Sequence, residues 1–375
     1  MKKINTLIWL ISFLLLTTTL VNAQTIKAIV ADEESRQVIT DVFVFLDNSS
    51  TGSITDKQGQ FELKTAVSHD LLLVFSHLNY ELNSLAVKDL ANLADTIFLT
   101  PSGLVLEEAV VVEKAKPRVR SRWLKRFKSE FLGEDYDKAL IHILNPEALL
   151  FKQDKGKLIA ESKTSLIIEN KVLGYQVQFF LEDYKSYKEG DLVYFGKVFF
   201  EELGGSKKEI AKYKRNRHKV YEQSSRHFFA NLVQQNGITN RYEVGYSLFS
   251  KNEEFINYEP IAADSLLITE FRKGKYEISI NRILTITNNQ LKINQGIRKN
   301  AGATMAGRVG NFKQTTNNLP RSYLWSKHGR IVVNKFGSIL NPTEVEEAGY
   351  WASFRVAALL PLDYAVKVKH KKWGL

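Results

Sequence analysis

The histidines, with the arginines and aromatic residues beside them, are the first candidates for chemistry in this sequence, because it contains no cysteine. The lack of cysteine excludes disulfides, thiolate metal sites and a cysteine nucleophile. His218 and His227 are nine residues apart in a stretch predicted to form one helix. That spacing puts them on opposite faces, so they cannot both ligate one metal ion from that helix. His227, beside Arg226 and Phe228, is interpreted as a structural residue that hydrogen-bonds at the helix end.

Motifs of the familiar catalytic and nucleotide-binding classes are missing from the sequence. It has no His-Glu-x-x-His, no Gly-x-Ser-x-Gly, no Walker loop and no Gly-x-Gly-x-x-Gly. A glycine-rich stretch contains Gly302, Gly307 and Gly310, but a phosphate loop needs Lys-Ser/Thr after its second glycine, and Arg308-Val309 stand there. A flexible loop is the better interpretation. We therefore predict no catalytic residue, no cofactor, no metal site and no enzymatic activity.

Some polar and aromatic residues are better candidates for binding a partner. Asn216, Arg217 and Arg226 are expected to form a polar cluster with Glu169 and Asn170, if their helix packs on that strand. A buried arginine–carboxylate pair mainly fixes geometry and is weak support for function.

The pair Tyr350-Trp351 could stack on a sugar ring, although packing in a core is the commoner use of such aromatic side chains. The complete set of candidate interaction residues is Trp123, Arg126, Phe127, Arg217, Arg226, His227, Tyr350 and Trp351.

Length and composition predict a folded, two-domain protein. The chain has 375 residues, of which 44% are hydrophobic and 25% charged, as in ordinary globular proteins. Its formal net charge is +11. A positive surplus favours anionic partners such as a membrane surface or an acidic polysaccharide, and it names none of them.

Residues 1–23 have the pattern of a cleavable secretory signal. Lys2 and Lys3 precede an apolar run from Leu7 to Leu16, and Val21-Asn22-Ala23 is a small-residue cleavage site before Gln24. An uncleaved anchor is the alternative, but the apolar run is short against the roughly 20 residues that a membrane span needs. We expect export to the periplasm or the outer membrane, which makes nucleic acid an unsuitable partner.

Residues 24–112 are predicted to form a β-sandwich, because short apolar strands alternate there with turn residues. Asp56 and Gly59 bracket a tight turn between strands near Ile54 and Phe61, which we expect to pair as a hairpin. The other expected strands are Thr25–Val30, Val42–Leu46, Leu71–Ser76 and Asp95–Leu99.

This segment resembles the carboxypeptidase-like regulatory domain common in secreted and outer-membrane proteins of Bacteroidota. The resemblance implies a seven-stranded transthyretin-like sandwich that is non-catalytic and carries no zinc ligands. Asn79 stands where the family usually has glycine, and it can also adopt the left-handed conformation. The matching residues are Val38, Asp41-Val42, Thr51-Gly52, Thr55-Asp56, Gly59, Phe61, Ser76–Tyr80 and Leu106–Val111.

Residues 113–135 are predicted to form a basic linker and an amphipathic helix. Between Lys114 and Ser129 there are many cations and no acid, while Trp123, Leu124, Phe127 and Phe131 recur at helical spacing. One interpretation is an interfacial helix in which residues 114–132 lie on an anionic membrane surface. The other, which we favour, is a linker helix that packs Trp123 and Phe127 onto the next domain.

Residues 136–375 are predicted to form a larger mixed α+β domain, so the whole chain is mainly β with an α+β second region. Ser206 and Glu209 form a capping box that opens one long helix to about Leu232. The stretch from Gly349 to Leu360 is predicted to be a helix that Pro361 ends.

The second region resembles one that accompanies the regulatory domain in short secreted Bacteroidota proteins, and this resemblance brings no activity with it. It departs from that pattern at Gln223, where glycine often precedes the serine. The matching residues are Asn145–Glu147, Ile168–Asn170, Leu173–Tyr175, Asn216-Arg217, Tyr221, Ser224, His227–Phe229, Trp351, Arg355, Leu360-Pro361 and Asp363-Tyr364.

Three functions stay open from the sequence. The leading one is a non-enzymatic envelope protein that binds or scaffolds a protein partner or a glycan. The second is a metal-independent hydrolase of envelope glycan or peptide, which would need two facing carboxylates in its largest pocket. The third is an accessory protein that acts in trans with an outer-membrane transporter. The sequence does not specify the oligomeric state.

Overall fold

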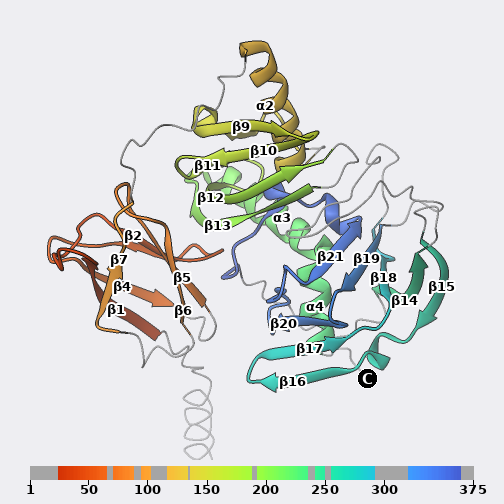
Figure 1. Ribbon diagram of the computed structural model, residues 1–375. Coiled ribbons are helices and arrows are strands. Elements are labelled where there is room, and N and C mark those ends of the chain that lie inside the picture. Colours follow the sequence, from red (N-terminus) through yellow and green to blue (C-terminus); the bar gives the residue numbers. More distant parts are fainter. Residues whose placement is uncertain are drawn as a thin grey trace, which may run out of the picture. The chain divides into compact units, whose positions relative to one another are not determined.

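The computed structural model describes residues 24–65, 71–87, 94–102, 116–133, 136–187, 192–234, 241–249, 255–291 and 320–364 (Figure 1). The chain divides into two compact units, Met1–Asp47 with Thr51–Val105, and Asn48–Ser50 with Leu106–Leu375. The predicted signal at residues 1–23, the Leu106–Val111 motif and the glycine-rich stretch at residues 302–310 lie outside the described residues.

The first unit is a sandwich of two sheets, with strand orders β4-β1-β7 and β3-β2-β5-β6. Alternate residues of the strands face inward, and Val30, Val44 and Phe75 are completely buried between the sheets. The predicted seven-stranded sandwich is therefore confirmed. Its strands are β1 (Gln24–Asp32), β2 (Phe43–Leu46), β3 (Gly52–Ile54), β4 (Gln60–Thr65), β5 (Leu71–Ser76), β6 (Asn83–Val87) and β7 (Thr96–Leu99).

The predicted turn at Asp56 is present, but the predicted hairpin is wrong. Asp56 Oδ1 accepts hydrogen bonds from the amides of Gln58 and Gln60, both at 2.9 Å, and Gly59 has φ +71°. The strands on either side of this turn belong to different sheets, since β3 pairs with β2 and β4 pairs with β1. The turn thus connects the two layers of the sandwich.

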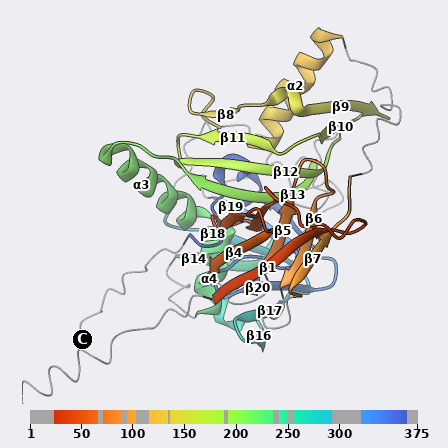
Figure 2. The ribbon, with the colours of Figure 1, turned by 90° about the vertical axis from the view of Figure 1, so that its left-hand side faces the viewer.

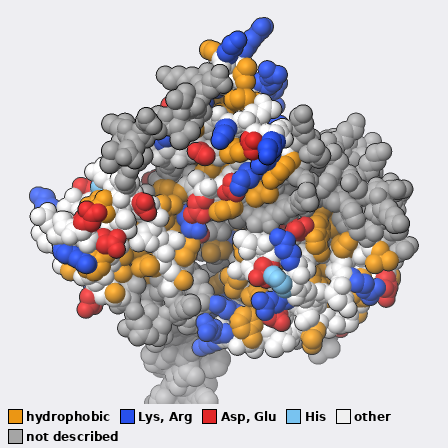
Figure 3. Space-filling model, in the orientation of Figure 1, with side chains coloured by type: hydrophobic (Ala, Val, Ile, Leu, Met, Phe, Trp, Pro, Cys, Tyr) orange, Lys and Arg blue, Asp and Glu red, His pale blue; other side chains and the backbone are white. Residues whose placement is uncertain are grey.

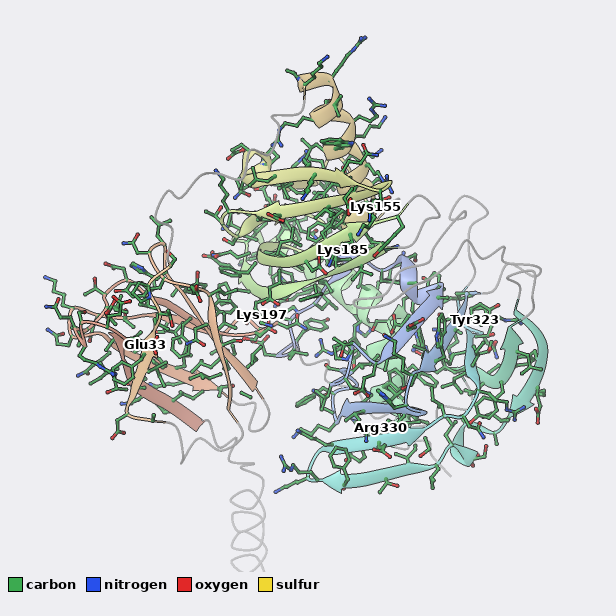
Figure 4. All side chains as sticks on the ribbon, viewed as in Figure 1. Glu33, Lys155, Lys185, Lys197, Tyr323 and Arg330 are labelled. Carbon is green, nitrogen blue, oxygen red and sulfur yellow. The ribbon has the colours of Figure 1, made fainter. Side chains whose placement is uncertain are left out.

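The second unit begins with a six-stranded sheet in the order β8-β11-β12-β10-β9, with β13 along the other side of β12. Helix α2 (Pro117–Leu132) packs on this sheet through Phe127 and Phe131, which are completely buried. Charged residues of β12 and β13 form ion pairs, Lys185 with Asp183 and Lys197 with Glu182. Figure 4 labels the two lysines. The strands are β8 (Ile141–Ile143), β9 (Leu149–Asp154), β10 (Lys157–Ser162), β11 (Leu166–Asn170), β12 (Tyr175–Ser186) and β13 (Leu192–Glu202).

Two helices follow where the sequence predicted one. The capping box of Ser206 and Glu209 is confirmed and opens α3 (Lys207–Gln223), but α3 ends there and α4 (Ser225–Val233) begins. Ser224 has extended backbone, and its Oγ accepts a hydrogen bond from the His227 amide at 3.3 Å. Because Ser224 caps the second helix, it ends the first, and His218 and His227 lie on separate helices.

The remaining strands form two further sheets around α4. Phe228, Phe229 and Leu232 of α4 share one buried cluster with residues of both sheets. Tyr323 on β19 and Arg330 on β20 mark this part of the unit in Figure 4. The five-stranded sheet has the order β15-β14-β18-β19-β21, and the three-stranded sheet has the order β16-β17-β20. The strands are β14 (Tyr242–Phe249), β15 (Phe255–Ile261), β16 (Ile268–Arg272), β17 (Lys275–Ser279), β18 (Ile283–Asn288), β19 (Arg321–Ser326), β20 (Arg330–Asn334) and β21 (Val345–Gly349).

The predicted final helix is wrong. Residues 350–364 form two short 3-10 turns, Trp351–Ser353 and Val356–Ala358, with extended backbone at Phe354 and Arg355 between them. Carbonyl groups after the second turn bind the Arg226 side chain. These long-range bonds satisfy the carbonyls without a helix.

The observed architecture agrees with the predicted class, mainly β with an α+β second region. No described helix is both long enough and apolar enough to cross a membrane.

Candidate functional site

The C-terminal half of α3 is fixed to the six-stranded sheet by Arg217, whose side chain is only 4% exposed. Its guanidinium donates to the carbonyl oxygens of Leu173 at 2.6 Å and Gly174 at 2.8 Å, and it pairs with Glu202 at 2.8 Å. It also stacks over the Tyr175 ring, 3.8 Å from the centroid. All three guanidinium nitrogens of Arg217 have partners within the protein, so Arg217 has a structural role.

Arg226, in the first turn of α4, likewise binds main-chain carbonyl groups, most of them in residues 350–364, which we call the C-terminal segment. Its guanidinium N–H donors point to the carbonyl oxygens of Phe336, Leu360, Pro361, Leu362 and Tyr364, at 2.7 to 3.4 Å. Desolvation lowers the pKa of this buried guanidinium. The predicted cluster with Glu169 and Asn170 is therefore wrong for Arg226, because its partners are main-chain carbonyls far away in sequence.

The partners predicted for the α3 residues also differ. Asn216 donates to the carbonyl oxygen of Val172 at 2.8 Å, in the turn after Asn170. Asn170 itself donates to the carbonyl oxygen of Ala357 at 2.9 Å, whereas Glu169 pairs with Lys171. The sequence therefore predicted correctly that α3 lies close to the end of β11, but it predicted the wrong hydrogen-bond partners.

His227 is partly buried at the edge of the core cluster that contains Phe228 and Tyr242. Its Nδ1 lies 2.7 Å from the Tyr242 hydroxyl, and its ring contacts Tyr221 edge-on. Desolvation, with a smaller contribution from Arg241, lowers the pKa of His227 to about 4. A neutral imidazole with a fixed hydrogen-bond partner fits the structural role expected from the sequence.

The second unit has two hydrophobic cores, one between α2 and the six-stranded sheet and one around α4. Between these two cores lies a cavity of about 240 Å³. The start of α4, the loop between β20 and β21, strand β21 and the C-terminal segment surround it. Most of its wall is apolar, including Val220, Ile339, Val345 and Leu359. The charged residues in the wall are Arg226, Glu347 and Arg355. A mainly apolar cavity with a few polar groups is the usual form of a small-molecule site.

Several polar groups lie in the cavity wall. The Tyr194 side chain is one of them and is only 3% exposed. The Ser338 hydroxyl is also buried with no hydrogen-bond partner among the described residues. Glu347 is hydrogen-bonded to Ser225, and desolvation raises the pKa of its carboxyl group to about 7. Buried polar groups without partners are costly, which makes them candidates for contact with a ligand.

Helix α2 is the linker helix that we favoured from the sequence, packed onto the domain that follows it. Trp123 packs on Phe151, with ring centroids 6.5 Å apart, and Phe127 packs on Phe151 and Tyr184. Arg126 donates to Ser186 Oγ and to the Tyr187 carbonyl oxygen. The aromatic face that a membrane contact would need is thus engaged in the core, while Figure 3 shows Lys and Arg atoms over the free end of α2.

Tyr350 and Trp351 also contribute to packing. Trp351 is 4% exposed, contacts Phe228, and donates from Nε1 to the Gln223 carbonyl oxygen at 3.0 Å. The Tyr350 hydroxyl contacts Gln223 Oε1 at 3.1 Å, and desolvation raises the pKa of Tyr350 to about 12. Of the eight predicted interaction residues, Arg226 and Trp351 line the cavity.

One exposed surface remains strongly basic. Lys208, Lys212, Arg215 and Lys219 recur at intervals of four, three and four residues along α3, so they share one face. All four are exposed, and the face opposite carries the buried Tyr213 and Arg217. Figure 2 shows that α3 extends beyond the sheet edge. We call these four exposed residues the basic stripe.

The sequence identified none of the polar cavity residues Tyr194, Ser338, Glu347 and Arg355 as a site. The positions with an available signal were Glu346 and Glu347, two acids between the buried Val345 and Ala348 of one strand. Strict alternation would have left one of those acids facing the core. Nothing in the sequence indicated that Tyr194 would join it.

Comparisons with known proteins bear on the first unit. Residues 26–112 match the family model of the CarboxypepD_reg-like domain. No curated protein matches the chain.

In the described part of the second unit, no three His, Asp or Glu side chains gather as a metal-binding group.

Proposed function

We propose that this protein is a non-catalytic, exported binding protein whose second unit takes a small ligand in the cavity between its two cores. The cavity is the observation that carries the proposal, since it combines an apolar wall with buried polar groups that lack partners. The β-sandwich of the first unit fits a role as an interaction module, because CarboxypepD_reg-like domains are generic β-sandwiches.

The carboxyl groups of the cavity favour binding over hydrolysis. Glycoside hydrolysis uses two carboxyl groups about 5–10 Å apart, one as acid and the other as base or nucleophile. Among the described residues that line the cavity, Glu347 is the single acid, and the other charged residues are arginines. This composition supports a site that holds a molecule without transforming it.

A neutral apolar dye tests the cavity directly. We expect Nile red to gain fluorescence with the wild-type protein, and Ala358→Phe, which fills the cavity from its wall, to abolish that gain. Ala211→Phe, on the exposed face of α3, is the matched control and should leave dye binding unchanged. Equal dye binding by all three proteins would contradict the proposal, as would sustained turnover of peptidoglycan or envelope polysaccharide by purified protein.

The proposed location rests on the sequence of residues 1–23. Cell fractionation should place the mature chain, beginning at Gln24, in the periplasm or with the outer membrane. Salt and carbonate washes then separate electrostatic attachment from integral attachment. Recovery of the intact precursor from the cytoplasm would overturn this part of the proposal.

The basic stripe on α3 favours an anionic envelope polymer as the macromolecular partner. Four exposed cations on one helical face attract polyanions by a long-range, salt-sensitive force. We expect retention on an acidic polysaccharide column at low salt. Changing Lys208, Lys212, Arg215 and Lys219 together to Gln should abolish retention, whereas changing Lys152, Lys155, Lys163 and Lys171 should reduce it less.

A further inference from the structure

We infer that the cavity of the second unit binds a small monocarboxylic acid with an apolar body, whose carboxylate is held by Tyr194 and Arg355. This inference rests on the proposed function and names the chemical class of its ligand. It has three supports: the charge of the wall, its hydrogen-bond donors and its apolar surface.

The charge of the wall favours an anion. Two guanidinium groups and one carboxyl group line the cavity. The carboxyl group of Glu347 is largely protonated below pH 7, because desolvation raises its pKa to about 7. The wall therefore carries a net positive charge at neutral or lower pH, and it lies in a poorly solvated place where charge is felt strongly.

The hydrogen-bond donors of the wall point to Tyr194 and Arg355 as the receiving groups. The donors of Arg226 are already directed at five carbonyl oxygens, so Arg226 contributes charge rather than a hydrogen bond. Tyr194 is close enough to both Arg355 and Glu347 for each charge to influence its pKa. The Tyr194 ring packs on Phe131 and Phe179, which do not line the cavity, so the hydroxyl is the end that reaches it.

A hydroxyl, a guanidinium and a protonated carboxyl group are all donors, and the Ser338 hydroxyl adds another. A donor-rich group of this kind matches the two acceptor oxygens of a carboxylate and does not match an ammonium group. The rest of the wall, including Val220, Ile339 and Leu359, would surround an apolar chain or ring.

Protonated Glu347 gives the site a pH dependence of known sign. Ser225 from α4 is hydrogen-bonded to Glu347, Tyr194 from β13 is close enough to respond to its charge, and Arg226 and Arg355 line the same cavity. When Glu347 loses its proton above pH 7, it changes from a donor into a second anion beside the ligand. Affinity for a carboxylate should then fall about tenfold between pH 6 and pH 8.

Octanoate, octanol and octylamine form a series of probes with one chain length and different charge. Their binding can be followed by isothermal titration calorimetry and by the fluorescence of Trp351, which lines the cavity. We expect octanoate to bind at least tenfold more tightly than octanol, and octylamine not to bind. Tighter binding of octylamine or octanol would overturn the ligand class but leave the binding function intact. Binding of none of the three, together with a negative dye experiment, would overturn both.

Two variants, each with a control, test the residues. Tyr194→Phe should weaken octanoate binding about tenfold and leave octanol binding unchanged, whereas Tyr276→Phe on β17, away from the cavity, should change neither. Glu347→Gln, which keeps a donor, should bind octanoate with an affinity that no longer changes between pH 6 and pH 8, in contrast to wild type. Unchanged octanoate binding by Tyr194→Phe, or an unaltered pH profile in Glu347→Gln, would contradict the proposed arrangement.

Discussion

The Asp56 turn of the first unit and the α3–α4 junction of the second unit are held in opposite ways. The Asp56 carboxylate binds amides two and four residues away. At the junction, Arg217 and Arg226 bind carbonyl oxygens that are 43 to 138 residues away in sequence. The turn is therefore stabilised by residues close to it in sequence, and the junction by residues far from it in sequence. We therefore expect perturbations of the junction to be large and perturbations of the turn to be small.

The tryptophans make this comparison measurable. Beyond residues 1–23, the sequence has tryptophan at positions 123, 325, 351 and 373, all within the second unit. Intrinsic fluorescence therefore reports unfolding of the second unit alone, whereas far-ultraviolet circular dichroism reports both units.

The largest effect should come from Arg226→Met. This change leaves carbonyl oxygens of the C-terminal segment without donors in a buried place. We expect a loss of at least about 3 kcal/mol in the free energy of unfolding of the second unit, measured by urea and tryptophan fluorescence. Arg215→Met, on the exposed face of the neighbouring helix, should cost under about 0.5 kcal/mol. Equal costs for the two variants would mean that the carbonyl contacts contribute little.

Gly174→Ala comes next in expected size. Gly174 has φ +70°, and an added Cβ would lie 2.2 Å from the Tyr213 ring of α3. Strain and overlap together should cost about 2–4 kcal/mol in the same experiment. Gly204→Ala, where nothing lies within 4 Å, is the matched control and should be near neutral. A mild effect at Gly174 would show that α3 can move away from the sheet.

The pH dependence of stability should change in His227→Gln. The pKa of His227 is lowered to about 4 in the folded protein, from its ordinary value of 6.5, so the unfolded chain binds more protons between these values. The contribution of His227 is thus present above pH 6.5 and is lost as the pH falls towards 4, by about 3 kcal/mol in total. Urea unfolding of the variant at pH 4 to 8 should be less acid-sensitive than that of wild type, whereas His142→Gln, at an exposed position of β8, should match wild type.

Ser224→Ala should have a smaller effect, about 1 kcal/mol, because it removes the cap of α4 but leaves both arginine contacts in place. Ser206→Ala removes the exposed cap of α3 and should cost no more. If Ser224→Ala were neutral, the break between the helices would be due to tertiary contacts alone. Urea unfolding followed by tryptophan fluorescence distinguishes the two outcomes.

The smallest effect should come from Asp56→Ala in the first unit. Loss of the two exposed side-chain bonds to the turn should cost about 0.5 kcal/mol, and Asp56→Asn should recover most of it, since asparagine forms the same kind of turn. The change should be visible by circular dichroism and absent from tryptophan fluorescence. A shift in the fluorescence transition would contradict the local character of this turn.

Prediction from the sequence succeeded mainly for features that depend on nearby residues and failed for features that depend on distant contacts. The Asp56 turn and the capping box at Ser206 were predicted because each depends on residues within a few positions of one another. The sandwich was predicted from short apolar strands between turn residues and from the family resemblance, although its strands pair over long separations. The break at Ser224 was missed because apolar spacing continues through it, and the third residue after Ser224 is His227 where a capping box would have Glu. The final segment was wrongly predicted as a helix because its Ala and Leu residues favour one, whereas distant contacts with Arg226 and Asn170 satisfy some of its carbonyl groups instead.

The cavity could not have been predicted by any local rule. Tyr194 and Glu347 are 153 positions apart, and only the completed fold brings both of them to one wall. Each alone looks like an ordinary strand residue.

The contacts of Arg226 also have a consequence for the order of folding. The Arg226 side chain binds four carbonyl groups at positions 360 to 364, and these four are synthesised more than 130 residues after it. Contacts of such long range slow folding, because a long loop must close before the contact forms. Until that closure, the cavity lacks one wall and a buried cation lacks its acceptors. The second unit should therefore fold late, in one concerted step after synthesis, and an arrested chain that stops before residue 360 should stay protease-sensitive.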